Sequence, residues 1–190
     1  MALRVSFSAA PEVLGETAGQ TALRAAIVWA VLAAFAVGIL GLVIAAPLAQ
    51  ANRSYALAAA IYQAFSYVCH QIPERSFHLA GHKFGVCSRC TGLYSGFALA
   101  ALVYPLTRSL TRTDSPRILW LLLAAVPLAA DFSLGYFSIW QNTHLSRFVT
   151  GALLGSVAVF YILPGLIELS STGVRNLRRR KPATLPDGRT

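Results

Sequence analysis

The stretch AAIVWAVLAAFAVGILGLVIAAPL, residues 25–48, decides the class of fold. Its 24 residues include no charged side chain. An α-helix rises about 1.5 Å per residue, so a run of this length crosses a hydrocarbon core about 30 Å thick with some tilt. The stretch therefore predicts a transmembrane helix.

Three more apolar stretches follow it, and they predict spans at residues 86–106, 118–140 and 148–167. We expect the span at residues 118–140, the third of the four, to break or bend near Gly135. A further apolar segment, residues 55–68, is short for a span and suits an interfacial or re-entrant helix. The pattern predicts an all-α integral membrane protein. We expect a bundle of about four transmembrane helices with one short interfacial or re-entrant helix.

The composition agrees with a membrane environment. Hydrophobic residues make up 56% and charged residues 12% of the chain, whereas soluble domains carry about 25% charged residues. The formal net charge of +9 comes from basic residues that lie in short segments between apolar runs. Membrane topology and anionic headgroups explain such charges better than nucleic acid does, so we expect a lipid bilayer as partner and no nucleic acid.

The apolar runs divide the chain into three parts. Residues 1–23 predict a flexible or loosely helical N-terminal tail, and residues 24–170 a transmembrane domain with a Cys/His loop at residues 69–90. Residues 171–190 predict a basic C-terminal tail, for which we expect anionic lipid headgroups as partners. The pattern gives no oligomeric state.

Lysine and arginine are distributed unequally between the two sides of this four-span arrangement. Eleven of the sixteen lie before the first span, between the second and third spans or after the fourth span, and five lie on the other side. Because cytoplasmic segments carry the excess of positive charge, we expect both termini in the cytoplasm. The cysteine loop is then extracytoplasmic.

The densest chemical signal is formed by three cysteines, Cys69, Cys87 and Cys90. Cys87 and Cys90 are three residues apart at the start of a predicted helix, so their thiolates can grip one metal ion, and Cys69 can add a third sulfur. His70 or His82 can complete a tetrahedron. Thiolate and imidazole ligands favour zinc, with copper or iron possible.

Other interpretations of these residues stay open. An extracytoplasmic Cys87/Cys90 pair at a helix N-terminus also suits a thiol–disulfide redox protein. A disulfide with one packed thiol would involve no chemistry at all. A transporter or an accessory membrane subunit is a third function class, because a buried carboxylate and polar helix ends also suit a permeation path.

Asp131 is the one carboxylate within the third predicted span. A charged group at that depth usually faces the bundle interior and finds a partner. Arg89 and Arg147 begin the second and fourth spans at the same end of the bundle, and they are the expected partners. The three residues are candidates for a catalytic pocket or for a structural ion pair.

Four glycines occur in two pairs with four-residue spacing. Gly92 and Gly96 lie in the second predicted span, and Gly151 and Gly155 lie in the fourth. Small residues at this spacing let transmembrane helices approach closely. We therefore expect the second and fourth spans to be in contact.

The cysteine loop also carries a resemblance to a known family. Residues 69–77 read CHQIPERSF and residues 86–96 read VCSRCTGLYSG, with Gly81 between them. This pattern resembles an uncharacterised prokaryotic family of small predicted membrane proteins with the signature CHQ-x-PERSF…C-x-RC-x-G-x-Y. With a looser match further along, the resemblance covers residues 55–160. It implies a membrane fold and a shared cysteine–histidine loop in a prokaryotic cytoplasmic membrane, and it implies no activity.

The charge asymmetry can be tested in intact cells. A reporter fused after Thr190 should behave as cytoplasmic, and a membrane-impermeant thiol reagent should label the cysteine loop from outside if its thiols are free. A fusion without the three cysteines is the labelling control. An extracellular reporter would overturn the assignment of sides.

Overall fold

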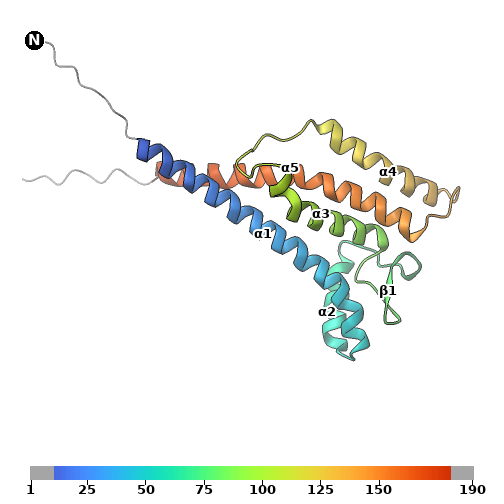
Figure 1. The fold of residues 1–190 in the computed structure, drawn as a ribbon. Helices are drawn as coiled ribbons and strands as arrows, with labels where there is room; N and C mark the ends of the chain where they lie inside the picture. The colour runs from blue at the N-terminus through green and yellow to red at the C-terminus, as the bar shows by residue number, and fades with distance from the viewer. Residues whose placement is uncertain (1–10, 181–190) are drawn as a thin grey trace, which may run out of the picture.

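The computed structural model describes residues 11–180, with side chains from residue 18 to residue 171. Its architecture is an all-α bundle, as the sequence predicted (Figure 1). The elements are α1 (Pro11–Ala51), α2 (Tyr55–Ser66), a 3-10 turn η1 (Pro73–Arg75), β1 (His78–Leu79), β2 (His82–Lys83), α3 (Ser88–Thr107), α4 (Ile118–Tyr136) and α5 (His144–Arg180).

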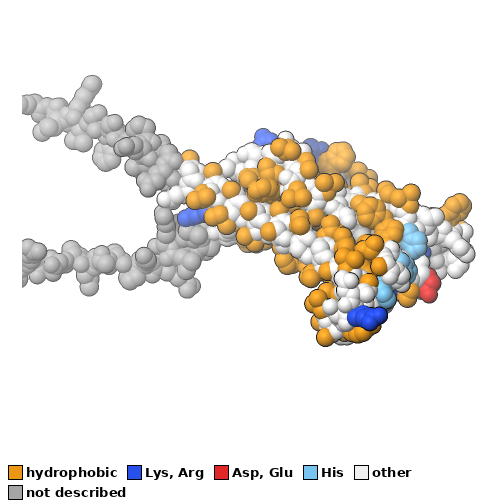
Figure 2. Space-filling model, turned by 60° about the horizontal axis from the view of Figure 1, so that its bottom comes forward, with side chains coloured by type: hydrophobic (Ala, Val, Ile, Leu, Met, Phe, Trp, Pro, Cys, Tyr) orange, Lys and Arg blue, Asp and Glu red, His pale blue; other side chains and the backbone are white. Residues whose placement is uncertain are grey.

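Four helical segments are long and apolar enough to cross a membrane, which agrees with the four predicted spans. They are Ala18–Ala51, Ser88–Thr107, Ile118–Tyr136 and His144–Ser171. At 12 residues, α2 is too short to cross as a helix. Large apolar side chains are exposed along α1, α3, α4 and α5, and Figure 2 shows them along the sides of the bundle. These exposed side chains suit contact with lipid.

The helices run back and forth, so the bundle has two different ends (Figure 1). One end holds the first residues of α1, the α3–α4 connection and the last residues of α5. The other end holds α2, the short β1–β2 hairpin and the N-termini of α3 and α5; we call it the cysteine end. The polar groups that the sequence singled out lie at the cysteine end.

Two helices are longer than predicted. Residues 11–23, expected as part of a flexible or loosely helical tail, belong to α1, and residues 171–180 of the predicted basic tail continue α5. Neither stretch contains proline after its first residue, so nothing stops the backbone hydrogen bonding of the helix outside the apolar run. The remainder of each predicted tail, residues 1–10 and 181–190, lies outside the described residues. Helix α4 ends at Tyr136, next to the bend expected at Gly135.

Helices α3 and α5 are in backbone contact at the four glycines. A Cβ atom added at Gly92 or Gly96 would lie 2.1 Å from a carbonyl oxygen of α5. One added at Gly151 or Gly155 would lie 2.2 or 2.1 Å from a carbonyl oxygen of α3. Real side chains essentially never approach this closely, so the contact requires glycine at all four positions. The predicted helix contact is confirmed.

Two of the prolines inside the helices, Pro47 and Pro105, free carbonyl groups that other segments then bind. Pro47 has no N–H to donate to the Val43 carbonyl one turn earlier in α1. The backbone N–H of Gly85 donates to that oxygen at 3.0 Å. A buried carbonyl in an apolar environment needs a partner. The segment that leads into α3 is therefore bonded to α1 two residues before Cys87.

A second proline acts in the same way in α3. Pro105 leaves the Ala101 carbonyl of α3 without its helical donor. The indole Nε1–H of Trp29 in α1 donates to it at 2.7 Å. This bond joins α1 to α3 within one apolar cluster that also includes buried side chains of α5.

Replacing Gly155 by Ala should weaken the α3–α5 contact, because the new methyl group meets the Leu93 carbonyl oxygen. We expect a loss of about 1–3 kcal/mol in the free energy of unfolding, the usual effect of overpacking. Denaturant titration in detergent micelles measures it. Gly165→Ala in the same helix is the matched control, since nothing lies within 4 Å of its added Cβ. Equal stability of the two variants would contradict the contact.

Candidate functional site

The three cysteines come together at the cysteine end. Cys69 follows α2, Cys87 is the N-cap of α3, and Cys90 lies on the first turn of α3. Their sulfur atoms all lie within 4.8 Å of one another, and all three are free thiols. Zn–S bonds of about 2.3 Å in a tetrahedron place sulfurs about 3.8 Å apart. Movements of about 1 Å would close the cluster around one ion.

Backbone N–H groups point at the sulfur of Cys69. The N–H of Gln71 donates to Cys69 Sγ at 3.5 Å, and the N–H of Cys87 donates to the same sulfur at 3.3 Å. Hydrogen bonds of this kind orient a sulfur that could bind a metal. The bond from Cys87 also joins the start of α3 directly to the segment after α2.

Gln71 shapes the turn after Cys69 in a way that the sequence analysis missed. Its backbone has a φ of +52°, a left-handed conformation that is uncommon for residues other than glycine. Its side-chain Nε2 donates to the Tyr62 carbonyl at 2.6 Å, and its own carbonyl accepts from Lys83 Nζ at 2.8 Å. The Tyr62 hydroxyl in turn donates to the Lys83 carbonyl at 2.5 Å. This closed set of bonds holds the loop on α2; its sequence signal is the Gln of the CHQ motif.

The sulfur cluster favours a negative charge on Cys87. Hydrogen bonds from the thiols of Cys69 and then Cys90 hold the pKa of Cys87 far below its usual range. Backbone hydrogen bonds at the start of α3 act in the same direction, and burial opposes them. A negative charge on Cys87 within this cluster favours the binding of a cation.

Histidine is less closely involved than the cysteines. Among the described residues, the group of potential metal ligands consists of the three cysteines alone. His70 is exposed and lines the same cavity as the cysteines. His82 lies half-buried on β2, in the hairpin beside the loop. Which of the two provides a fourth ligand stays a prediction.

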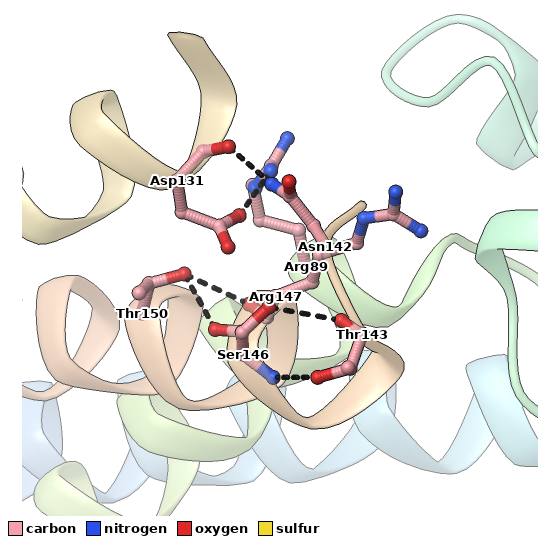
Figure 3. A network of polar contacts seen from close by, with 7 residues as sticks. All are labelled: Arg89, Asp131, Asn142, Thr143, Ser146, Arg147 and Thr150. Carbon is pink, nitrogen blue, oxygen red and sulfur yellow. Dashed lines mark hydrogen bonds and ion pairs between the residues drawn. The ribbon is translucent and has the colours of Figure 1, made fainter. Parts of the chain in front are cut away.

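Asp131 is paired, as the sequence predicted, and its partner is Arg89. The carboxylate of Asp131 in α4 forms an ion pair with the Arg89 guanidinium of α3 (Figure 3). Their side chains are 10% and 21% exposed, so the pair is largely removed from solvent. The Asn142 amide donates to the backbone carbonyl of Asp131, and the Arg89 guanidinium lies 5.5 Å from the centre of the Phe132 ring.

Arg147 lies beside this pair without joining it. It belongs to the first turn of α5, where the Thr143 hydroxyl accepts the Ser146 N–H at 3.0 Å and caps the helix (Figure 3). Together with Arg75 of η1 and with Arg89, it lines a cavity of about 190 Å³. A cavity of about 210 Å³ that contains the three cysteines has the same three arginines in its wall. Arg75 was not among the predicted site residues.

These features define a polytopic helical membrane protein with a cluster of three thiols beside an arginine-lined cavity. The family model for "Predicted membrane protein (DUF2085)" matches residues 69–161, which include the cysteine loop, α3, α4 and the first half of α5. The chain belongs to this family, in agreement with the resemblance noted from its motifs.

Two archaeal relatives are similar to part of the chain. The uncharacterized protein MJ1492 of Methanocaldococcus jannaschii is 37% identical over 109 residues, which are 57% of this chain and 70% of that protein. An uncharacterized protein of Methanothermobacter thermautotrophicus is 34% identical over 108 residues, 54% of this chain and 93% of that protein. No solved structure matches the chain significantly.

The Arg89–Asp131 pair can be tested by removing one partner and then both. Asp131→Ala leaves a largely buried guanidinium unpaired, so we expect a loss of about 3 kcal/mol in the free energy of unfolding. The double variant Arg89→Met with Asp131→Leu removes both charges and should recover most of that loss. Denaturant titration in micelles measures each variant. A double variant as unstable as the sum of its single variants would contradict a direct pair.

Proposed function

We propose that the protein is a membrane metal-binding protein that holds one ion at Cys69, Cys87 and Cys90. The observation that carries the proposal is the convergence of three sulfurs within 4.8 Å from two separate segments of the chain. Zinc is the first expectation because thiolates favour it, and copper or iron are alternatives. The family's description names a membrane protein and no reaction, so the proposal concerns binding.

The surroundings of the sulfurs support this proposal. Two backbone N–H groups already donate to Cys69 Sγ, and such outer bonds orient ligands and tune a metal centre. A divalent ion with three thiolates carries a net charge of −1. The guanidinium groups of Arg75 and Arg147 offset it, since both line the same cavity as the cysteines and neither forms an ion pair with a described residue.

The fourth position decides whether the metal would be structural or catalytic. His70 or His82 in that position would close the site, whereas water or substrate there would make it reactive. In the second case Asp131, Arg89 and Arg147 are the proposed catalytic candidates. From the distribution of lysine and arginine, we place the site at the extracytoplasmic surface of a prokaryotic cytoplasmic membrane.

A thiol–disulfide function of Cys87 and Cys90 is the second candidate. The observation in its favour is the lowered pKa of Cys87 next to a second thiol in the same cluster. A thiolate at a helix N-terminus beside another cysteine suits disulfide exchange. A transporter or accessory-subunit role has no comparable observation behind it.

The two functions can be separated on the purified full-length protein. We expect about one metal ion per chain by elemental analysis, together with three thiols that react only after a chelator removes the ion. The variants Cys69→Ser, Cys87→Ser and Cys90→Ser should each lower the metal affinity by at least about 100-fold, because each removes a thiolate ligand. His78→Gln is the matched control in the same loop, since His78 is exposed and lies outside the cluster.

Other results would contradict metal binding. Protein free of metal, with two thiols lost and regained on mild oxidation and reduction, would favour the redox function instead. Unchanged metal affinity in all three serine variants would place any metal elsewhere in the chain.

A further inference from the structure

Three arginines meet at the cysteine end, and they come from three separate segments. Arg75 belongs to η1, Arg89 to α3 and Arg147 to α5. All three line both the 190 Å³ cavity and the adjoining cavity of the cysteines. We call the space that these three arginines line the arginine pocket. No acidic side chain is among the described residues that line these two cavities.

The positive charge of the arginine pocket is only partly neutralised. Asp131 pairs with Arg89, but Arg75 and Arg147 form no ion pair with any described residue. Glu74 is exposed and lines a third cavity together with Arg75 and Arg147. Arg75, Arg89 and Arg147 all line the same cavity. Like charges held this close cost free energy unless an anion joins them.

Unused hydrogen-bonding groups lie at the same place. Nε of Arg89, which can donate to a phosphate oxygen, and Oδ1 of Asn142, which can only accept and so suits a water or a phosphate hydroxyl, are buried without a hydrogen-bond partner among the described residues. Buried polar atoms in native proteins nearly always have a partner, which is protein, water or ligand. Arg89 and Asn142 both belong to the wall of the 190 Å³ cavity.

We propose that the arginine pocket binds a phosphate group. Guanidinium groups match phosphate oxygens with paired, charge-assisted hydrogen bonds, which a lysine could not provide in that geometry. The two uncompensated arginines, Arg75 and Arg147, balance the double negative charge of a phosphate monoester. This proposal goes beyond the metal site and does not rest on it.

The position of the pocket allows two sources for the phosphate. Phe132 and Tyr136 in its wall are 52% and 73% exposed on the outer face of α4, where apolar and aromatic residues meet the bilayer interface. An anionic lipid headgroup could enter from that side, and a soluble phosphate compound from the aqueous side. The recognising chemistry is the same for both.

Binding can be measured with the full chain in an uncharged detergent. One arm titrates inorganic phosphate by calorimetry, and the other compares phosphatidic acid with phosphatidylcholine by native mass spectrometry. We expect saturable binding in at least one arm, at least about tenfold weaker in Arg75→Gln and in Arg147→Gln, since each loses charge-assisted hydrogen bonds. Arg147→Lys should be intermediate, because it keeps the charge without the planar fork. Arg53→Gln is the matched control, an exposed arginine at the α1–α2 turn outside the pocket.

The outcomes separate this proposal from the metal site. Binding only in the lipid arm would support a headgroup site, and binding only in the first arm would support a soluble phosphate. Cys87→Ser should lose metal and keep phosphate binding. Equal affinity in wild type, Arg75→Gln and Arg147→Gln would overturn the proposal, as would absence of binding in both arms. Loss of phosphate binding in Cys87→Ser would also overturn it, because the metal would then be the phosphate ligand.

Discussion

The backbone contact between α3 and α5 sets the register of the polar groups that these two helices carry at the cysteine end. In lipid, apolar surface gives little drive for two helices to associate, so close packing must provide it. Here carbonyl oxygens of each helix approach glycines of the other, and any side chain would separate them. Because the Arg89 carbonyl lies against Gly151, the side chains of Arg89 and Arg147 start from neighbouring turns. A shift of one helical turn between α3 and α5 would move Arg89 away from Arg147. The cavity that both residues line would then lose its wall.

The cysteine loop depends on a second constraint, which is the need to satisfy backbone groups away from water. Pro47 leaves a carbonyl in α1 that only another segment can bind, and the Gly85 N–H binds it. Gln71 fixes the other end of the loop on α2. With both ends of the loop held, Cys69 and Cys87 have little freedom to separate. These bonds involve no sulfur, and they hold the segments that carry Cys69 and Cys87 close together.

The sequence predicted the parts of the structure that depend on local pattern. Long uncharged runs predicted the spans, four-residue spacing predicted the glycine contact, and a helical C-x-x-C predicted two sulfurs on one side. What it missed depends on contacts between distant segments. Ala80 and Gly81 both adopt positive φ in the tight turn of the β1–β2 hairpin, which an Ala–Gly pair signals only weakly. The choice of Arg89 rather than Arg147 for Asp131, and the presence of Arg75 in the pocket, follow from tertiary packing alone.

The charges at the cysteine end explain why one arginine is paired and two are not. Without Asp131, three guanidinium groups would line one cavity with no internal counter-charge, and their repulsion would oppose closure of α4 onto α5. With it, Arg89 is held against the helix pair by an internal partner. Arg75 and Arg147 remain for external negative charge, which a thiolate-bound divalent ion with its net −1 and a phosphate group would both supply. Two anionic occupants of one connected space repel each other, so each should bind more weakly when the other is present. That coupling ties any chemistry of the thiols to the occupancy of the arginine pocket.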